Sequence, residues 1–484
     1  MTIGITGYGV YIPHLRLSRK AVVDANAWFA PNLKGKGRGH RSMANWDEDA
    51  ITMAVAAARD ALPESVDRQA LAKVMLASEN LPFAERLNAG ILAGALGLAD
   101  DVVANDLGGA QSIALSSLAQ AVSAAKADGE ASLLVAASHR RTRAASAQEL
   151  DYADGAAAIT VGTENVLAEV LASASHTVDF VDHFRLQGEE IWVRDEGIAK
   201  LGPKSVNAAL EKAGINAADV NYFIFPSVFK KADAQLAKRC GINDAAVVDN
   251  LSAELGDCGT AQGLIMLAGV LESAQPGQII VLSQFGSGCN TVVLRVTDAI
   301  SGFKPVRGLT AQLASGKEEA SYTRFLAYKG QLKLERGMRG EQDKKTALST
   351  SYRHHKSLLG FIAGRCKESG DVHFPPSRIS YTPGNHVQDP YSLADKRGKV
   401  LSWSAEYLSS YMAPPHQYGQ VDFIGGGRVL MEFTDVAPGD IDNGFEVEMV
   451  FRVKDIDELR GYKRYFWKAK PASYNNADSS AAAE

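Results

Sequence analysis

The sequence of 484 residues predicts an α/β protein built from two similar halves, followed by a smaller antiparallel β-domain. Three observations lead to this fold class. Two stretches of the chain resemble each other, the strands within them are apolar without alternation, and the last third of the chain alternates apolar with polar residues. Hydrophobic residues make up 46% and charged residues 22%, proportions that suit a globular protein with full-sized cores.

The internal similarity lies in the first 300 residues. Residues 102–122, followed by 131–141, resemble residues 247–271, followed by 277–288. Each stretch reads as a short strand, a turn with glycine, a helix of small apolar residues and a second strand. Similarity on this scale indicates a duplicated unit.

The layer order follows from which elements are apolar on all sides. The helices predicted over 109–126 and 260–273 are apolar on almost every face, so we expect them at the centre. Continuous apolar strands are typical of sheets covered on both faces. Amphipathic helices over 47–62 and 203–214 then supply the outer layers. The expected order is helix, sheet, buried helices, sheet, helix.

The chain changes character after residue 300. Residues 315–345 are rich in charge and predict one or two solvent-facing helices with a polar linker. From 350 to 470 alternating strands separated by turn clusters predict a small antiparallel barrel. The final NNADSSAAAE is a low-complexity tail.

Charge and cysteine content exclude several classes of function. A net charge of -5, from 51 basic and 56 acidic residues, gives no broad basic face, so nucleic acid is not expected as a partner. Four scattered cysteines are too few for a disulfide framework and favour a cytoplasmic location. The start of the chain lacks a signal-peptide pattern, and no run of 18 apolar residues predicts a membrane span.

Several motifs resemble the hydroxymethylglutaryl-CoA synthase-like branch of the thiolase superfamily. They are the opening GITGYGVYIP, the segment NWDEDAITMAVAAARDAL, the ASEN turn, ILAGALGL and the late GSG turn. FIAGRC, HFPPSRI, GKVLSWS, FTDV and YFWK resemble the OB-fold domain that is fused to some members and normally carries a zinc ribbon. The resemblance implies a duplicated five-layered thiolase fold plus a C-terminal OB-fold β-barrel. The predicted domains are 1–165 and 166–300 for the two thiolase-like halves, 301–350 for a helical linker, 351–470 for the OB-fold domain and 471–484 for a disordered tail.

The resemblance also implies where the catalytic groups stand. In the superfamily an acylated cysteine at the N-terminus of the first buried helix works with a histidine, and the synthase branch adds a glutamate. Glu79, just beyond a buried strand, matches that glutamate. The cysteine position holds Gly108, the histidine position falls on Pro226 or Ser227, and the asparagine that often follows is Asp257. A covalent acyl-cysteine is therefore not expected.

Two interpretations of these losses remain open. A catalytically dead member of the family would explain them directly. Alternatively, the small residues Gly108, Gly109 and Ser112 leave backbone N–H groups uncovered at a helix start, which predicts an oxyanion or anion pocket. A substrate would then bring its own nucleophile, and Glu79 would move the proton.

For each further candidate site residue, a purely structural role is the alternative interpretation. Cys258 at the second helix start is a candidate nucleophile, and Cys289 in the GSG turn a candidate substrate contact, but a buried packing thiol explains either. The charged segment 181–197 matches the family's tunnel roof or is a solvated helix face. The remaining candidates are His183 as replacement acid or base, Arg194 as a substrate contact, and Lys230 and Lys231 as CoA contacts or a plain surface pair.

No zinc is expected in the ribbon, because a structural zinc needs four suitable ligands. The ribbon positions read Cys366, Ser369, Ser380 and Pro383, and nearby histidines have the wrong spacing to replace the lost thiols. The sequence therefore predicts a metal-free remnant with the barrel retained.

Three functions from different classes follow. The first is an acyl-CoA-dependent acyltransferase that makes or cleaves a carbon–carbon bond next to a carbonyl, with Glu79 as acid or base. The second is CoA transfer from an acyl-CoA to a carboxylic or β-keto acid through a glutamyl adduct on Glu79. The third is a non-catalytic subunit for a separate thiolase. CoA thioesters are expected as substrates, not bound cofactors, and a homodimer is expected from the family and from an apolar sheet edge.

Overall fold

The computed structural model describes residues 2–179, 184–186, 198–335, 347–380, 387–409 and 411–472. The chain divides into two compact units, residues 1–332 (unit 1) and 333–484 (unit 2). Each unit is described by itself below. The predicted candidates His183 and Arg194 lie outside the described residues.

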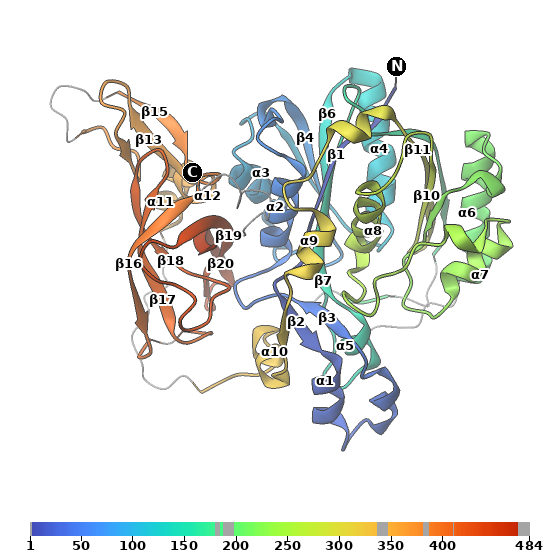
Figure 1. Cartoon of the computed structure of the whole chain (residues 1–484), viewed down its shortest axis with the longest axis horizontal. Helices are drawn as coiled ribbons and strands as arrows, with labels where there is room; N and C mark the ends of the chain where they lie inside the picture. The colour runs from blue at the N-terminus through green and yellow to red at the C-terminus, as the bar shows by residue number, and fades with distance from the viewer. Residues whose placement is uncertain are drawn as a thin grey trace, which may run out of the picture. The chain divides into compact units, whose positions relative to one another are not determined.

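Unit 1 is organised around a nine-stranded sheet with the order β5-β4-β6-β7-β1-β8-β11-β10-β9 (Figure 1). The first half of the chain supplies β1 Gly4–Tyr11, β4 Leu71–Ala77, β5 Val103–Leu107, β6 Ala131–His139 and β7 Asp154–Gly162. The second half supplies β8 Ala168–Thr177, β9 Tyr222–Ile224, β10 Ile279–Phe285 and β11 Gly288–Val296.

The two halves repeat one pairing scheme. β1 and β8 each begin a half, and each pairs antiparallel with the last strand of its half, β7 or β11. That last strand pairs antiparallel with β6 or β10, which in turn pairs parallel with β4 or β9. A fifth position follows in parallel, β5 in the first half and an isolated bridge from Phe223 to Val247 in the second. This repeat confirms the duplication predicted from the sequence.

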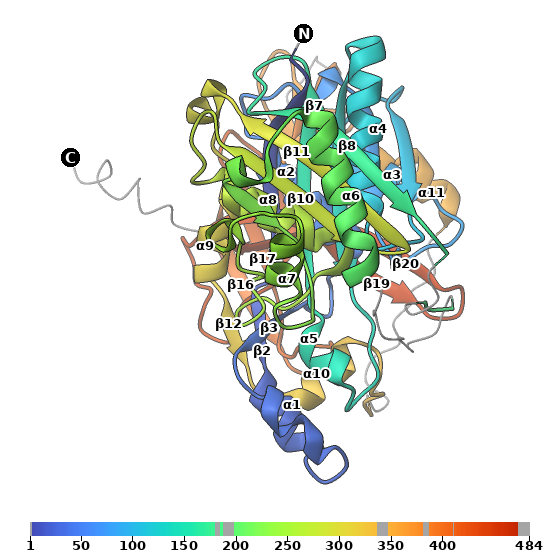
Figure 2. The same ribbon diagram turned by 90° about the vertical axis from the view of Figure 1, so that its right-hand side faces the viewer.

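The helices form the layers expected from their apolar faces. Helices α4 Ile113–Asp128 and α8 Gln262–Leu271 contact strands of both halves, so they lie between them (Figures 1 and 2). Helix α2 Ala50–Ala61 covers β1, β6 and β7, and helix α6 Ile198–Ala213 covers β8, β10 and β11. The start of α2 is fixed by a capping box between Asp49 and Thr52.

One prediction about the central helices is wrong in part. Nine of the ten residues of α8 are buried, as expected. Helix α4 instead leaves Gln120, Ser123 and its last turn exposed. Alanine and serine suit either environment, because they bring little apolar surface, so the sequence pattern does not distinguish a half-exposed helix from a buried one.

The remaining elements of unit 1 surround this core. A small sheet, in the order β12-β2-β3, pairs the segment just beyond the second half with the N-terminal region. Its strands are β2 Leu15–Ser18, β3 His40–Met43 and β12 Lys317–Glu319, so part of the predicted linker belongs to unit 1. The other helices are α1 Arg19–Asn26, α3 Asn88–Leu96, α5 Ala147–Asp151, α7 Ala232–Arg239, α9 Gly308–Ala314 and α10 Tyr322–Tyr328.

Unit 2 contains two antiparallel sheets. The alternating pattern predicted antiparallel strands, and their closure into a barrel stays a prediction. Their orders are β14-β13-β15 and β18-β17-β16-β19-β20, and Phe433 forms an isolated bridge to Ala469 of β20. The strands are β13 Ile362–Cys366, β14 Val372–His373, β15 Gln388–Ser392, β16 Gly398–Glu406, β17 His416–Phe423, β18 Arg428–Glu432, β19 Glu446–Asp457 and β20 Tyr462–Pro471. Two short helices, α11 Leu348–Arg353 and α12 His355–Leu359, precede them.

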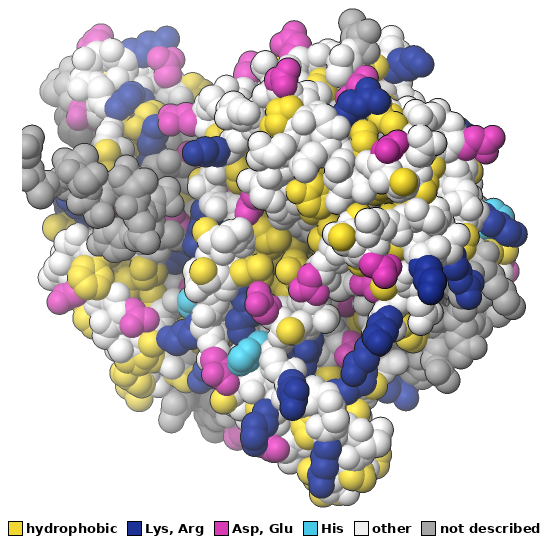
Figure 3. All heavy atoms as spheres, turned by 45° about the vertical axis from the view of Figure 1, so that its right-hand side comes forward, with side chains coloured by type: hydrophobic (Ala, Val, Ile, Leu, Met, Phe, Trp, Pro, Cys, Tyr) yellow, Lys and Arg dark blue, Asp and Glu magenta, His cyan; other side chains and the backbone are white. Residues whose placement is uncertain are grey.

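The surface carries both signs of charge. On the face in Figure 3, acidic and basic side chains are interspersed, and basic ones gather at the lower end, where Figure 1 places α1. In the part of the chain that the structure describes, no helix combines the length and apolarity needed to cross a bilayer.

Candidate active site

The candidate site lies where two neighbouring parallel strands end. Strand β4 ends at Ala77 and leads into Ser78 and Glu79, and strand β6 ends at His139 and leads into Arg140. Because β4 and β6 pair in parallel, their carboxyl ends meet at one edge of the sheet. The geometry therefore brings Glu79 and Arg140 together.

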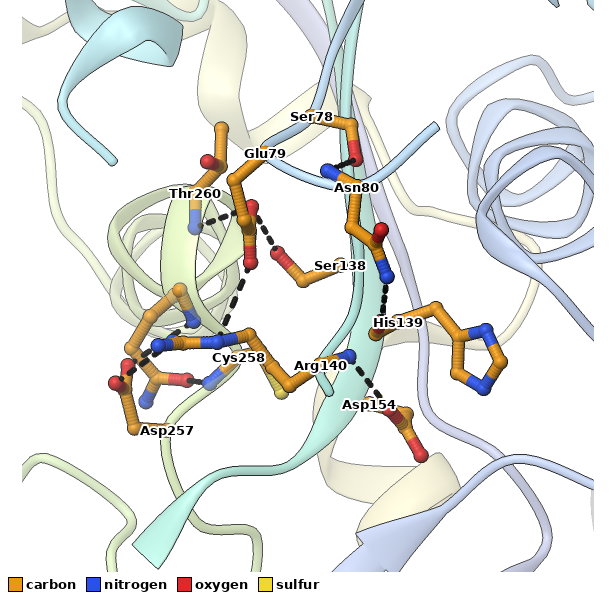
Figure 4. A network of polar contacts seen from close by, with 12 residues as sticks. Ser78, Glu79, Asn80, Ser138, His139, Arg140, Asp154, Asp257, Cys258 and Thr260 are labelled. Carbon is orange, nitrogen blue, oxygen red and sulfur yellow. Dashed lines mark hydrogen bonds and ion pairs between the residues drawn. The ribbon is translucent and has the colours of Figure 1, made fainter. Parts of the chain in front are cut away.

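The carboxylate of Glu79 is held from three sides (Figure 4). The hydroxyl of Ser138 donates to its Oε2 at 2.9 Å, and the backbone N–H of Thr260 donates to the same oxygen at 3.3 Å. The Nε of Arg140 lies 3.4 Å from Oε1, and the Glu79 side chain is only 9% exposed. The predicted carboxylate of Glu79 is thus held in one position by these partners.

Arg140 connects that carboxylate to a second one. Its fully buried guanidinium donates from Nη1 to Oδ2 of Asp257 at 3.0 Å and stacks 3.6 Å above the ring centre of Tyr152. Burial by itself would lower the pKa of Arg140, but Asp257, Tyr152 and Glu79 hold it above its ordinary value. Burial raises the pKa of Asp257, and Arg140 opposes that effect.

Gly259 gives the cluster its space. Its φ of +51° is in the left-handed region, and a Cβ there would overlap Oε1 of Glu79 and stand 2.6 Å from Nη1 of Arg140. Its N–H donates to Oδ1 of Asp257 at 3.0 Å. Only glycine allows the ion cluster and this backbone contact to coexist.

A second buried ion pair fixes the backbone of Arg140. Asp154 accepts the N–H of Arg140 at 3.0 Å and pairs with Nζ of Lys329 at 2.7 Å. Burial would raise the pKa of Asp154, but Lys329, His139 and Arg41 lower it to about 2. Burial lowers the pKa of Lys329 to about 8. Both groups are charged at neutral pH.

A small cavity of about 20 Å³ opens beside the cluster, with room for about one water molecule. Pro226 and Ser227, the positions matched to the family histidine, line it together with Asp257. Tyr152, Gly259 and Gln284 are on its wall as well. The structure therefore brings the predicted histidine and asparagine positions into one site.

The helix beside the predicted anion pocket begins later in the chain than the sequence predicted. Helix α4 begins at Ile113 rather than at residue 109, because Gly109 adopts a φ of +102° in the preceding turn. Gly108 and Gly109 are exposed, and the Ser112 hydroxyl donates to the carbonyl of Gly286 at 2.7 Å. The paired glycines therefore precede the first helical turn instead of forming it. Gly108 lies next to the site, since a Cβ there would stand 3.2 Å from the carbonyl oxygen of Ser78.

The two predicted cysteines are buried. Cys258 follows Asp257 but packs into the core, with its sulfur 3.0 Å from where a Cβ on Gly155 would stand. Burial raises its pKa well above the ordinary value, which keeps the thiol protonated. Burial raises the pKa of Cys289 to about 11, and this thiol lies 3.2 Å from the hydroxyl of Ser283 in a separate core cluster.

The predicted CoA contacts are at the surface. Lys230 and Lys231 are exposed, and they directly follow the segment 226–229 that lines the cavity. Within the predicted roof segment, Arg185 donates to the carbonyl oxygen of Glu79 at 2.8 Å. One described residue of that segment thus contacts the site.

The zinc-ribbon positions in unit 2 do not fit a structural zinc. The sulfur of Cys366 accepts the N–H of Ser369 at 3.5 Å, and the Ser380 hydroxyl lies 3.3 Å from Nε2 of His373. Hydroxyls are poor replacements for thiolates as zinc ligands. Over the described ranges, no group of three or more His, Cys, Asp and Glu side chains gathers as a metal site.

Sequence reasoning missed Arg140, the residue with the most contacts to other charged groups in the site. It was included only as the end of an apolar strand, in ASLLVAASHRR. The available signal was positional, since a charged residue follows β6 just as Glu79 follows β4. Tyr152 and Gln284 gave no comparable signal, because only the folded chain brings them to the cavity.

Comparisons with known proteins agree with this fold. The family model described as 3-oxoacyl-[acyl-carrier-protein (ACP)] synthase III C terminal matches residues 210–296. A hydroxymethylglutaryl-CoA synthase of Archaeoglobus fulgidus is 30% identical over 343 residues, which cover 68% of this chain and 99% of that protein. A hydroxymethylglutaryl-CoA synthase of Methanosarcina mazei is 28% identical over 349 residues, 69% of this chain and all of that protein.

Solved structures show the same fold. The 3-oxoacyl-(acyl carrier protein) synthase III of Pseudomonas aeruginosa PAO1 superposes with a TM-score of 0.55, at 23% identity, over 62% of this chain and 99% of that one. The HMG synthase of the curacin biosynthetic pathway gives 0.57 at 18% identity, over 68% of this chain and 88% of that one. The chain thus contains a thiolase-like α/β fold. The chain belongs to the hydroxymethylglutaryl-CoA synthase family.

Proposed function

We propose that this protein makes or cleaves a carbon–carbon bond next to the carbonyl of an acyl-CoA, without a covalent acyl-cysteine, and that Glu79 moves the proton. The supporting observation is the ordered Glu79 carboxylate, held by Ser138, Thr260 and Arg140 beside the position where Gly108 replaces the family's nucleophile. The names of the relatives support acyl-CoA condensation as the reaction class.

The contacts of Glu79 suit general acid–base chemistry. Two hydrogen bonds and the guanidinium stabilise the carboxylate, and they fix its direction in a largely buried site. A base in that position removes a proton from the carbon next to a thioester carbonyl, or returns one to it. Since Gly108 cannot be acylated, the second substrate, a small carboxylic or β-keto acid or its thioester, reacts within one non-covalent complex.

CoA transfer through Glu79 is the second candidate. Within the described residues Oε1 of Glu79 accepts no hydrogen bond and lies 3.4 Å from Nε of Arg140, so this oxygen has the lone pairs that a nucleophile needs. The two roles differ in their intermediate. Hydroxylamine or borohydride added during turnover modifies Glu79 only if a glutamyl thioester forms.

We also propose an OB-fold barrel for unit 2 and a homodimer as the assembly. The two antiparallel sheets and the bridge from Phe433 to Ala469 support a closed OB-fold barrel with a metal-free ribbon remnant. Strand β5 is at the edge of the nine-stranded sheet with Val103 51% exposed, which supports a homodimer formed through that edge. A separate thiolase partner would use other surfaces.

The deciding experiment is Glu79→Gln, which keeps the shape of the side chain and removes the base. Purified protein is incubated with acetyl-CoA and a panel of β-keto acids and thioesters, and the CoA products are measured by mass spectrometry. We expect a loss of about 10²–10⁴ in rate for a general base. Glu272→Gln is the matched control, because its carboxylate accepts hydrogen bonds from Leu309 and Thr310 of helix α9, away from the candidate site. Full activity in folded Glu79→Gln would refute the proposal.

A further inference from the structure

One residue that lines the cavity beside Asp257 has a buried side-chain oxygen for which the described residues provide no hydrogen bond. Gln284 lines this cavity, and its side chain is 2% exposed. Its amide nitrogen donates to the carbonyl of Gly259 at 2.9 Å, while its Oε1 is buried and accepts no hydrogen bond within the described residues. A buried amide oxygen without a donor is costly, and an ordered water is the common remedy.

The same cavity has the size and the partners that a water requires. Its volume of about 20 Å³ exceeds the 10–15 Å³ or so that one water occupies. Besides Gln284, the polar residues Asp257 and Tyr152 line it. A water here can donate one hydrogen to Gln284 and the other to Asp257, which leaves its lone pairs for a third contact.

The position gives that water a chemical role. Among the described residues that line the cavity, Pro226 and Ser227 stand at the position of the family histidine, no histidine is present, and Asp257 is the one carboxylate. Asp257 is held by Arg140 and by the Gly259 N–H, each through a different oxygen. Burial raises the pKa of Asp257, which makes the carboxylate a better proton acceptor than an exposed one.

We infer that this cavity holds the nucleophilic water of a hydrolytic carbon–carbon cleavage, with Asp257 as its base and a β-ketoacyl-CoA as the substrate class. The inference rests on the proposed function and names the nucleophile that the missing cysteine leaves open. Gln284 orients the water, and Glu79 gives a proton to the carbon between the two carbonyl groups.

The step balances in atoms and charge. Water oxygen bonds to the β-carbonyl carbon while Asp257 takes one proton. The bond between the β- and α-carbons then breaks, and its electron pair remains on the α-carbon as the thioester enolate. That carbon takes one proton from Glu79, which begins this cycle protonated. The products are a carboxylic acid and a shortened acyl-CoA, and the two carboxyl groups re-equilibrate their proton through solvent.

Isotope labelling of the unaltered protein tests this directly. Acetoacetyl-CoA is incubated in H₂¹⁸O without added CoA, and the products are analysed by mass spectrometry. We expect acetyl-CoA and acetate in equal amounts, with one ¹⁸O from solvent in the acetate. Asp257→Asn should lower this rate by about 10²–10⁴ and Gln284→Met by less, because orientation alone is lost. Asp106→Asn is the control, since Asp106 contacts the start of helix α3.

The alternative outcomes separate the two proposals. If acetyl-CoA forms only after CoA is added, two molecules per turnover and without ¹⁸O, the water is not the nucleophile, while carbon–carbon chemistry stands. If no carbon–carbon cleavage or formation occurs with any thioester, the proposed function fails and the inference fails with it.

Discussion

Replacing Arg140 with methionine removes the one side chain that contacts both carboxylates of the site. Methionine has a similar length and fits an apolar surrounding, so the change deletes charge more than volume. Arg140 is fully buried, Glu79 is 9% exposed and Asp257 is 16% exposed. The variant therefore leaves two poorly hydrated carboxylates without their cation.

The expected cost follows from that burial. Removing one partner of a buried ion pair destabilises a protein by about 3–5 kcal/mol, because the remaining charge is uncompensated. The cost should depend on pH in a defined direction. Burial already raises the pKa of Asp257, and Arg140 opposes the rise, so in the variant the folded state takes up protons more readily than the unfolded state. Above the pKa of Asp257 in the folded state the variant has its full loss of stability, and it regains stability as the pH falls through that pKa.

Urea unfolding at pH 8, 7, 6 and 5 measures this effect. We expect the deficit of Arg140→Met against the unaltered protein to shrink steadily toward pH 5. Arg16→Met is the control, because Arg16 is also buried but donates to backbone carbonyls, among them that of Gln312 at 3.0 Å. Its deficit should not change with pH. A deficit for Arg140→Met that stayed constant, or grew on acidification, would refute the electrostatic account of the site.

Two further predictions concern the backbone and the assembly. In urea unfolding, Gly259→Ala should destabilise unit 1 by about 1–3 kcal/mol more than Gly129→Ala. Both glycines have positive φ, but only a Cβ at Gly259 would clash with Glu79 and Arg140. Equal losses would count against the tight cluster. Analytical ultracentrifugation at micromolar concentration should give about twice the chain mass of 51.7 kDa, since the edge of β5 is open; a folded monomer would exclude the dimer.

The fold was largely predictable because it depends on apolar patterning. Continuous apolar strands and the internal similarity predicted a duplicated sheet, and the strand order repeats as expected. The start of α4 was not predictable from pattern alone. The apolar pattern extends through the turn in which Gly109 adopts positive φ. Such a pattern does not show at which residue the backbone becomes helical.

The site was predictable only where a single strand determines it. Glu79 follows a strand whose apolar run is clear, so its position at the sheet edge could be inferred. The cluster around Arg140 joins residues that are far apart in the chain, with Asp257 and Thr260 arriving from the second half. Such contacts depend on how the halves pack, which local patterning does not encode. The water cavity beside Gln284 is hidden for the same reason.

The charges of the site argue against a decayed enzyme. At the position where an asparagine often stands in the family, the chain has Asp257, which adds a buried negative charge to that of Glu79, and Arg140 supplies one positive charge. Buried charges are costly compared with apolar residues of the same volume, so a site without function gains stability by losing them. This site instead keeps three charged groups, a glycine that makes room for them and a second ion pair that fixes the backbone of Arg140. Two carboxylates beside one guanidinium would leave a net negative charge, which one bound proton neutralises. In the proposed cleavage Glu79 gives up that proton while Asp257 takes one from water.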